Sequence, residues 1–374
     1  MTIAVNTRFL LADYLEGYGY ITHECFKRIT KDHPEHRFIF IFDRPFDERF
    51  IYSDNIIPVV IGPPARHPLL WKWWYDVRIP RLLRKYKADI FVSPDGHCSL
   101  HTSVPQCLVI HDLAFLHHPS HIKKSHYYYY KKNTPRFIKK AKSIVTVSEF
   151  TKADILSRYK VEDNNIDVVY NAARPVFKLI DDAQRENVKS TFTSGKEFFL
   201  YTGSIHPRKN LVNLLKGFSI FKKRLQSSVK LVIAGRLAWK YDSFLNDLKT
   251  YKYRHDVILA GYLPEEDLAA LTGAAYAMVY PSLLEGFGMP VLEAMQSGTP
   301  VITASGSAMQ EVAGDAALYC DVTSPAQIGE KMILIYNDEN LRNQLILKGM
   351  DTAKKYSWEK TSNSLWQSIC NTKN

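Results

Sequence analysis

The segment EGFGMPVLE places two glutamates, Glu285 and Glu293, on either side of a glycine-rich turn. Pro290 suits the first turn of a helix, which we expect to run to about Ser297. A helix N-terminus attracts anions because its first N–H groups have no partner within the helix. Two interpretations of the glutamates are open. Glu285 could complement the helix dipole while Glu293 is solvated, or the two carboxylates could hold different parts of a hydroxyl-rich ligand.

A second candidate is the segment YTGSIHPRKN at 201–210, where a predicted strand ends at Gly203. Arg208 and Lys209 follow in a polar loop, directly before a helix that we expect to begin near Asn210. Adjacent cations at the carboxyl end of a strand, beside a helix N-terminus, could clamp a diphosphate. The alternative is that both are ordinary surface cations.

Taken together, the two segments resemble the retaining glycosyltransferases of family 4. The resemblance is carried by the E-x7-E motif Glu285/Glu293 within PSLLEGFGMPVLEAMQSGTPVI. It is reinforced by GSIHPRKN, by VIHDL with His111, by VTVSEFTKADI at 145–155 and by the closing YSWEKT. The resemblance implies the GT-B architecture of two Rossmann-like domains, and transfer of a sugar from a nucleotide-sugar donor with retention of configuration.

The resemblance also implies roles for the charged residues. Glu293 would hold the ribose hydroxyls of the donor, and Glu285 would face the hydroxyls of the transferred sugar. Arg208 and Lys209 would bind the diphosphate and stabilise the negative charge that develops as it leaves. Such pre-aimed cations supply electrostatic stabilisation, which is commonly the largest catalytic term.

Smaller contributions are implied for the first half of the chain. His111 would contact the sugar, with Asp112 orienting it, although an ordinary loop histidine is the alternative. Gly17 and Gly19 in EGYGY would form a tight loop near the phosphates and acceptor, although a lone GxG also fits a simple strand-to-helix turn. The residues expected to be catalytic are Glu285, His111, Arg208 and Lys209. Those expected to bind the donor are Glu293, Gly286, Phe287, Gly288, Met289, Pro290, Gly17, Gly19 and Gly203.

Short apolar, β-rich runs alternate with helical patterns along the chain, which predicts an α/β fold of parallel sheets covered on both faces. The predicted strands are 3–6, 38–42, 89–93, 107–111, 143–148, 166–170, 197–203, 230–235, 257–261, 277–282 and 300–305. We expect an acceptor-binding Rossmann-like domain at 1–175 and a nucleotide-sugar-binding one at 176–355, facing a central cleft. Residues 356–374 should form a helix that returns toward the first domain.

The net charge of +11 is concentrated in residues 1–175, which carry 26 Lys/Arg and 18 Asp/Glu. Two stretches, 66–87 and 120–142, interleave cations with Trp, Tyr and Phe, as suits an anionic membrane surface. The alternative is two helices whose aromatics are core and whose lysines are solvated. Nucleic acid attracts the same charges, but no zinc-finger or aromatic RNA-binding motif occurs, so we expect no nucleic-acid partner.

We expect no metal or other cofactor, because no D-x-D triplet is present. Five scattered cysteines without CxxC spacing favour a reducing compartment. The N-terminus does not resemble a signal peptide, and the longest uncharged stretch, 268–284, is too short to span a bilayer. These features predict a cytoplasmic protein that is soluble or lies on a surface. The basic aromatic stretches add the expectation of a peripheral place on the inner face of the cell membrane.

VIHDLAFLHHP and VSEFTKADI most resemble mannosyltransferases of bacterial surface-polysaccharide assembly. GDP-mannose is therefore the first expected donor, with a saccharide, lipid-linked acceptor, and GYLPEEDL at 261–268 is the expected base pocket. UDP-glucose, UDP-galactose and UDP-N-acetylglucosamine remain alternative donors. An epimerase or phosphorylase on the same architecture, or a catalytically silent nucleotide-sugar-binding scaffold, are alternative functions.

Overall fold

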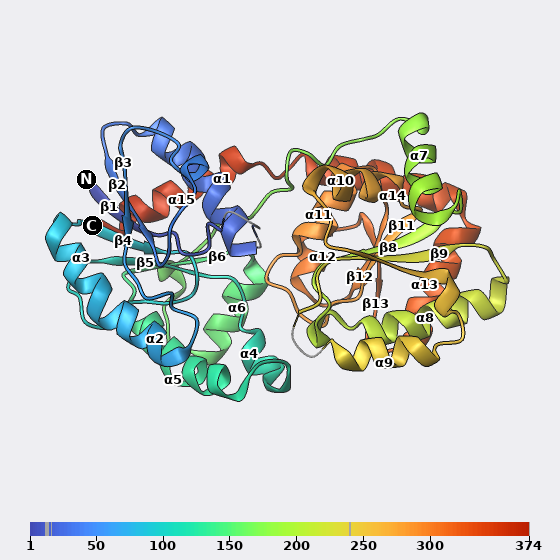
Figure 1. Cartoon of the computed structure of the whole chain (residues 1–374), viewed down its shortest axis with the longest axis horizontal. Helices are drawn as coiled ribbons and strands as arrows, with labels where there is room; N and C mark the ends of the chain where they lie inside the picture. The colour runs from blue at the N-terminus through green and yellow to red at the C-terminus, as the bar shows by residue number, and fades with distance from the viewer. Residues whose placement is uncertain (12–14, 16, 239–240, 374) are drawn as a thin grey trace. The chain divides into compact units, whose positions relative to one another are not determined.

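The computed structural model describes residues 1–11, 15, 17–238 and 241–373. The chain forms two compact units, which are described here one by one (Figure 1). Unit 1 comprises Met1–Asn171 and Ser357–Asn374, and unit 2 comprises Ala172–Tyr356. The first crossing between them therefore lies a few residues before the predicted boundary at 175. Each unit has the α/β architecture expected from the alternation of strand and helix patterns.

Unit 1 is built on a seven-stranded sheet in the order β3-β2-β1-β4-β5-β6-β7. All of its strand pairs are parallel. The strands are β1 (Thr2–Asn6), β2 (Arg37–Phe42), β3 (Ile56–Val60), β4 (Ile90–Ser93), β5 (Gln106–Ile110), β6 (Ser143–Thr146) and β7 (Ile166–Val168). The helices are α1 (Gly17–Asp32), α2 (Pro68–Trp73), α3 (Ile79–Tyr86), α4 (Ala114–His117), α5 (Lys124–Lys140), α6 (Glu149–Arg158) and α15 (Trp358–Lys373), with a π-helical turn, Trp74–Arg78, between α2 and α3.

The strand β3 was not among the predicted strands. Its sequence, IIPVV, carries Pro58 at the centre, and proline cannot donate to a sheet ladder. β3 is an edge strand that pairs with β2. Proline is tolerated at such an edge because its missing N–H can face away from the neighbouring strand.

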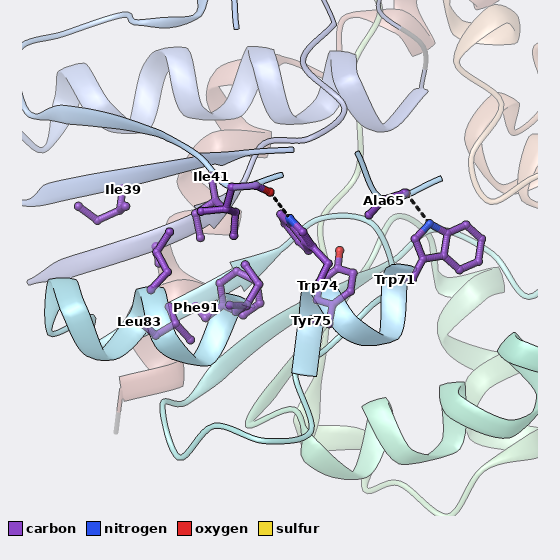
Figure 2. Close-up of a cluster of buried hydrophobic side chains, with 12 residues drawn as sticks. Ile39, Ile41, Ala65, Trp71, Trp74, Tyr75, Leu83 and Phe91 are labelled. Atoms are coloured by element: carbon purple, nitrogen blue, oxygen red, sulfur yellow. Dashed lines mark hydrogen bonds between the residues drawn. The ribbon is translucent and has the colours of Figure 1, made fainter. Parts of the chain in front are cut away.

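The segment 66–87 contributes a large part of the core of unit 1 (Figure 2). Trp71, Trp74 and Tyr75 are buried against β-strand side chains such as those of Ile41 and Phe91. The indole N–H groups are satisfied, because Trp71 Nε1 donates to Ala65 O at 2.6 Å and Trp74 Nε1 to Ile61 O at 2.8 Å. Packing therefore explains three of the five aromatic residues of this stretch.

The C-terminal helix α15 belongs to unit 1, where its red ribbon lies among blue and teal elements (Figure 1). It packs against α1 and β6. Trp366 stacks on His33 with 4.0 Å between ring centroids. Ser368 Oγ donates to Asp167 Oδ2 at 2.6 Å. The helix thus returns to the unit that contains the N-terminus.

Unit 2 is built on a six-stranded parallel sheet in the order β10-β9-β8-β11-β12-β13. The strands are β8 (Phe198–Thr202), β9 (Lys230–Ala234), β10 (Val257–Gly261), β11 (Ala277–Tyr280), β12 (Val301–Ala304) and β13 (Ala317–Cys320). The helices are α7 (Asp182–Thr193), α8 (Leu211–Leu225), α9 (Asp242–Thr250), α10 (Glu265–Ala274), α11 (Met289–Gln296), α12 (Ala308–Ala313), α13 (Pro325–Asn337) and α14 (Glu339–Ala353). Since β8 and β11 are neighbours, the two candidate segments that follow them leave the same edge of the sheet.

Candidate active site

The loops after β8 and β11 are joined by backbone hydrogen bonding. A single 3-10 turn, Pro207–Lys209, follows β8 and is capped by His206, whose Nδ1 accepts from the backbone N–H of Arg208 at 3.2 Å. Leu283 N, in the loop after β11, donates to Arg208 O at 2.9 Å. The turn that carries the two cations therefore has a fixed position relative to the loop that carries Glu285.

Three of the predicted site residues meet at this edge. Lys209 Nζ lies 2.5 Å from Glu285 Oε1, and Arg208 Nη1 lies 3.3 Å from Glu285 Oε2. Ser282 Oγ donates to Glu285 Oε1 at 2.5 Å, and Lys209 Nζ donates to Tyr280 Oη at 2.8 Å. Two cations and one carboxylate give the cluster a net positive charge, as an anion-binding site requires.

The environment keeps Glu285 ionised. Burial alone would raise the pKa of its carboxyl, but the charges of Arg208 and Lys209 and the hydrogen bonds from Lys209 and Ser282 outweigh burial and lower the pKa to about 2. An ionised carboxylate only accepts hydrogen bonds. Glu285 is therefore suited to binding hydroxyl groups and unsuited to acting as a general acid.

The residue before helix α11 is Gly288, and its backbone conformation and close packing require a glycine. Gly288 has φ of +93°, and a Cβ on it would lie 2.7 Å from Met309 Cγ. Met289 and Pro290 occupy the first turn of the helix, as predicted from the sequence. Gly286 is buried, as is Phe287, whose ring meets that of Tyr356 edge to face with centroids 5.7 Å apart. The turn before α11 is therefore closely packed.

Glu293, the second glutamate of the motif, is buried on α11 and 3% exposed, so it is not a solvated side chain. Its carboxylate is paired with Arg174, whose Nε lies 2.5 Å from Oε1 and whose Nη2 lies 3.0 Å from Oε2. Sequence reasoning did not single out Arg174, which precedes Pro175 at the predicted domain boundary. A lone arginine 119 positions from its partner has no spacing that would reveal the pair.

Gly203 directly follows β8 and has φ of +131°, and a Cβ there would lie 3.0 Å from Tyr201 Oη. Its own N–H donates to Ala234 O at 2.9 Å. The glycine is therefore needed for the backbone path after the strand. Any contribution to donor binding would come from close approach of the backbone rather than from this N–H.

His111 follows β5 in unit 1 and is buried. Its Nε2 lies 2.8 Å from Pro94 O. A carbonyl oxygen only accepts, so Nε2 carries the hydrogen and Nδ1 of the neutral ring is the acceptor. Burial lowers the pKa of His111, although the hydrogen bond to Pro94 O opposes the effect. The ring also contacts Tyr18, with centroids 4.4 Å apart. Asp112 Oδ1 accepts from Ala114 N at 2.9 Å.

The two glycines predicted to form a tight loop after the first strand lie instead in the first turn of helix α1, so the loop prediction was wrong for them. Gly19, on α1, is buried, and a Cβ on it would lie 2.6 Å from Phe9 O. A Cβ on Gly17, the first residue of α1, would have no atom of the described residues within 4 Å. Close backbone packing therefore requires glycine at position 19, whereas the described part of the chain does not require it at position 17.

A buried ionic cluster in unit 1 was also missed from the sequence. Arg8 follows β1 and donates from Nε to Asp95 Oδ2 at 2.6 Å, after β4. Tyr75 Oη donates to Asp95 Oδ2 at 2.7 Å, and Ser93 Oγ to Asp95 Oδ1 at 3.1 Å. The Asp95 side chain is fully buried and that of Arg8 is 5% exposed. The pair joins the carboxyl ends of two neighbouring strands.

Within the described residues, no group of three or more His, Cys, Asp or Glu side chains is arranged to hold a metal ion. Over the same part of the chain, no helix combines the length and the apolar character needed to cross a membrane.

Comparison with known protein families identifies the family to which the chain belongs. A model described as "Glycosyltransferase Family 4" matches residues 29–175, and one described as "Glycosyl transferases group 1" matches residues 182–351. Together the two matches take in most of both units. The chain is a family 4 glycosyltransferase.

Named relatives and solved structures agree with this assignment. The glycosyltransferase is 28% identical to O-antigen chain mannosyltransferase B of Escherichia coli over 298 residues, 79% of this chain and 78% of that protein. It is 29% identical to the O-antigen chain mannosyltransferase RfbU of Salmonella typhimurium over 290 residues, 73% of each chain. Its fold is similar to that of Anabaena HepE, solved with UDP and glucose, with a TM-score of 0.76, 13% identity and 99% of both chains covered. The architecture is GT-B.

Proposed function

We propose that the enzyme transfers mannose from GDP-mannose to a saccharide acceptor in bacterial surface-polysaccharide synthesis, with retention of configuration. The cluster of Lys209, Arg208 and Glu285 is the observation that carries this proposal. The similarity to two O-antigen mannosyltransferases supports the choice of sugar. A lipid-linked acceptor and a place on the inner face of the membrane are parts of the same proposal.

In the proposed reaction the bond from the anomeric carbon to the diphosphate breaks, a bond to the acceptor's hydroxyl oxygen forms, and the hydroxyl proton passes to the leaving diphosphate. The enzyme therefore has to supply charge rather than a proton donor. Departure of a nucleoside diphosphate places negative charge on the leaving oxygens. Arg208 and Lys209 would meet that charge, while Glu285 accepts hydrogen bonds from the sugar. His111, in unit 1, offers Nδ1 as a further acceptor for a sugar hydroxyl. We propose that these cations take the place of a metal ion, since they supply the electrostatic stabilisation that a metal would otherwise give.

A donor assay tests the proposed function. Purified enzyme is incubated with GDP-mannose, UDP-glucose, UDP-galactose or UDP-N-acetylglucosamine in the presence of EDTA, and release of the nucleoside diphosphate is measured. We expect turnover with GDP-mannose and an undiminished rate in EDTA. NMR of the product should show that the anomeric configuration of the donor is kept. An absolute requirement for Mn²⁺ or Mg²⁺, or an inverted product, would contradict the proposal.

Transfer from a UDP-sugar is the second candidate function. The fold similarity to HepE, whose structure contains UDP and glucose, favours it. Turnover that is faster with a UDP-sugar than with GDP-mannose would replace the mannose proposal and leave the glycosyltransferase assignment intact.

An anionic membrane surface is a proposed partner of unit 1. The helices α2 and α5 are in contact, and the rings of Trp71 and His126 join them with centroids 4.8 Å apart. Leu69 and Tyr128 are 74% and 66% exposed on these helices, and Leu70 and Trp73 are also exposed. Exposed cations lie beside them at Arg66, Lys72, Lys123, Lys124, Lys131 and Lys132. We call this set of exposed side chains the basic apolar surface.

Flotation with liposomes tests the membrane proposal. We expect the enzyme to float with vesicles containing phosphatidylserine at low salt, and less so at high salt, because charges contribute about 1 kcal/mol each near such a surface. Replacing Lys123, Lys124, Lys131 and Lys132 with glutamine should weaken binding by about fivefold per lysine. Leu69→Ser should weaken it further, whereas Leu347→Ser, at a leucine 65% exposed in unit 2, should not. Absence of flotation at low salt would remove the proposal.

A further inference from the structure

Arg174 is the residue through which Glu293 is held in place. Its guanidinium meets the carboxylate with two parallel hydrogen bonds, which fix the plane of the carboxylate as well as its position. The Glu293 side chain is 4% exposed and that of Arg174 is 11% exposed. An ionised carboxylate at this depth is stable only with a charged or hydrogen-bonding partner.

Arg174 is itself held from several sides. Its guanidinium carbon lies 4.5 Å from the centroid of the Phe177 ring. Gln296, on the same helix as Glu293, donates from Nε2 to Arg174 O at 3.1 Å and to Phe177 O at 2.6 Å. The segment 174–177 therefore contacts α11 in two ways. The Arg174 side chain pairs with Glu293, and the carbonyl oxygens of Arg174 and Phe177 accept from Gln296. This support pre-organises the guanidinium, so that the carboxylate has one orientation.

We propose that Arg174 is a positioning residue for the ribose of the nucleotide-sugar donor. The inference rests on the proposed function, in which Glu293 binds that ribose. A carboxylate has about four lone-pair sites, and the bidentate arginine uses one on each oxygen. One site on each oxygen remains, which matches the two neighbouring hydroxyls of a ribose. By fixing the plane of the carboxylate, Arg174 sets the directions in which these two sites can accept hydrogen bonds.

A second contact extends this role to the segment predicted to meet the base. Arg174 Nη1 lies 3.4 Å from Glu265 Oε1, at the start of α10. Glu265 belongs to GYLPEEDL, and its side chain is 37% exposed. The Arg174 guanidinium thus contacts both Glu293, which is proposed to bind the ribose, and the segment 261–268, which is predicted to meet the base. The contact of Arg174 with Glu265 is longer and more exposed than its contact with Glu293. We therefore expect it to contribute less to holding the guanidinium in place.

Binding of nucleotides with and without ribose hydroxyls tests the inference. GDP, UDP and their 2′,3′-dideoxy forms are titrated by calorimetry into wild type, Arg174→Lys, Arg174→Met and Glu293→Gln. In wild type we expect the preferred diphosphate to bind about 10- to 100-fold more tightly than its dideoxy form, as for hydrogen bonds to a charged group. Arg174→Met should lose most of this preference while binding of the dideoxy form is unchanged. Arg174→Lys, which keeps the charge but not the bidentate geometry, should be intermediate.

Kinetics give an independent readout. Binding of the ribose is the same before and during the reaction, so Arg174→Met should raise KM for the donor while kcat stays within about threefold of wild type. Glu186→Gln serves as the control, because Glu186 is a 66% exposed partner of Lys189 outside these contacts, and it should change neither constant by more than about threefold. A fall in kcat that equals the fall in kcat/KM would overturn the inference.

The failures of the two proposals are distinguishable. If wild type does not prefer the ribose form, or binds neither diphosphate, then the role of Glu293 in the proposed function is wrong. If wild type prefers the ribose form and Arg174→Met keeps that preference, or loses affinity for both forms equally, then Arg174 has only a structural role. Should Arg174→Met unfold, the double variant Arg174→Met/Glu293→Gln removes the unpaired charge. That variant must then bind both nucleotide forms alike.

Discussion

Lys209→Ala is expected to lower kcat by about 10²- to 10³-fold, the range seen when one electrostatic stabiliser is removed from an active site. Lys209 Nζ is the closest cation to Glu285 and is itself 9% exposed, so water replaces it poorly. Its loss removes positive charge from the place where the leaving diphosphate develops negative charge. Steady-state release of nucleoside diphosphate, measured with saturating donor, gives kcat for both proteins.

Lys222→Ala is the matched control for this substitution. Lys222 is also a buried lysine of unit 2, 6% exposed, with a carboxylate partner, Asp256, at 2.9 Å. Its removal should affect thermal stability and leave kcat within about threefold of wild type, because it lies outside the cluster around Glu285. A kcat for Lys209→Ala within that same range would refute the role of Lys209. Equal, near-zero turnover in wild type and Lys209→Ala would favour a nucleotide-sugar-binding scaffold over an enzyme.

The cluster around Glu285 could be predicted because its members belong to short segments at strand ends. Arg208 and Lys209 lie in the loop after one predicted strand, and Glu285 lies in the loop after another. In a parallel sheet the carboxyl ends of neighbouring strands share an edge, so local patterns are enough to bring such residues together. The turn that contains Gly288 was predictable for the same reason, whereas the contact with Met309 on α12 that requires a glycine there was not.

The partners of buried charges could not be predicted in this way. Arg174 and Glu293 are 119 positions apart, and Arg8 and Asp95 are 87 apart. Each pair depends on how the sheet and its helices pack, and one arginine in a sequence gives no sign of which carboxylate it will meet. The basic aromatic stretches were ambiguous for a related reason. Helical spacing separates Trp71 from Trp73, but only packing shows that the first is core and the second exposed.

Asp95→Asn is expected to destabilise unit 1 by about 3–5 kcal/mol, the usual loss when one partner of a buried ion pair is removed. The substitution leaves the Arg8 guanidinium buried with a neutral neighbour, while the hydrogen bonds of Tyr75 and Ser93 are weakened. For a unit of this size the loss corresponds to a fall of roughly 6–20 °C in melting temperature. Calorimetry of the full chain measures this fall in melting temperature. We expect the unfolding transition of unit 1 to shift to lower temperature and that of unit 2 to stay unchanged.

Asp163→Asn is the control, because Asp163 pairs with Lys152 at 3.0 Å but its side chain is 75% exposed. A surface pair of this kind contributes about 0–1 kcal/mol. If Asp95→Asn cost no more than this control, then the buried pair would not stabilise unit 1. Adding Arg8→Met to Asp95→Asn should restore part of the lost stability, because no charge is then left buried without a partner.

The pH dependence of stability shows whether the charge or the shape of the Asp95 side chain stabilises unit 1. Burial alone would raise the pKa of its carboxyl, but Arg8, His97 and the hydroxyl of Tyr75 together hold the pKa well below its usual range. In the unfolded chain the pKa of an aspartate is about 3.9. Because the folded pKa is the lower one, the stabilisation is fully present above that value and is lost as the pH falls below it. The deficit of Asp95→Asn relative to wild type should therefore be constant from about pH 5 to 7 and shrink below about pH 4. A deficit that stayed the same at pH 3 would mean that the shape of the side chain, and not its charge, stabilises the joined ends of β1 and β4.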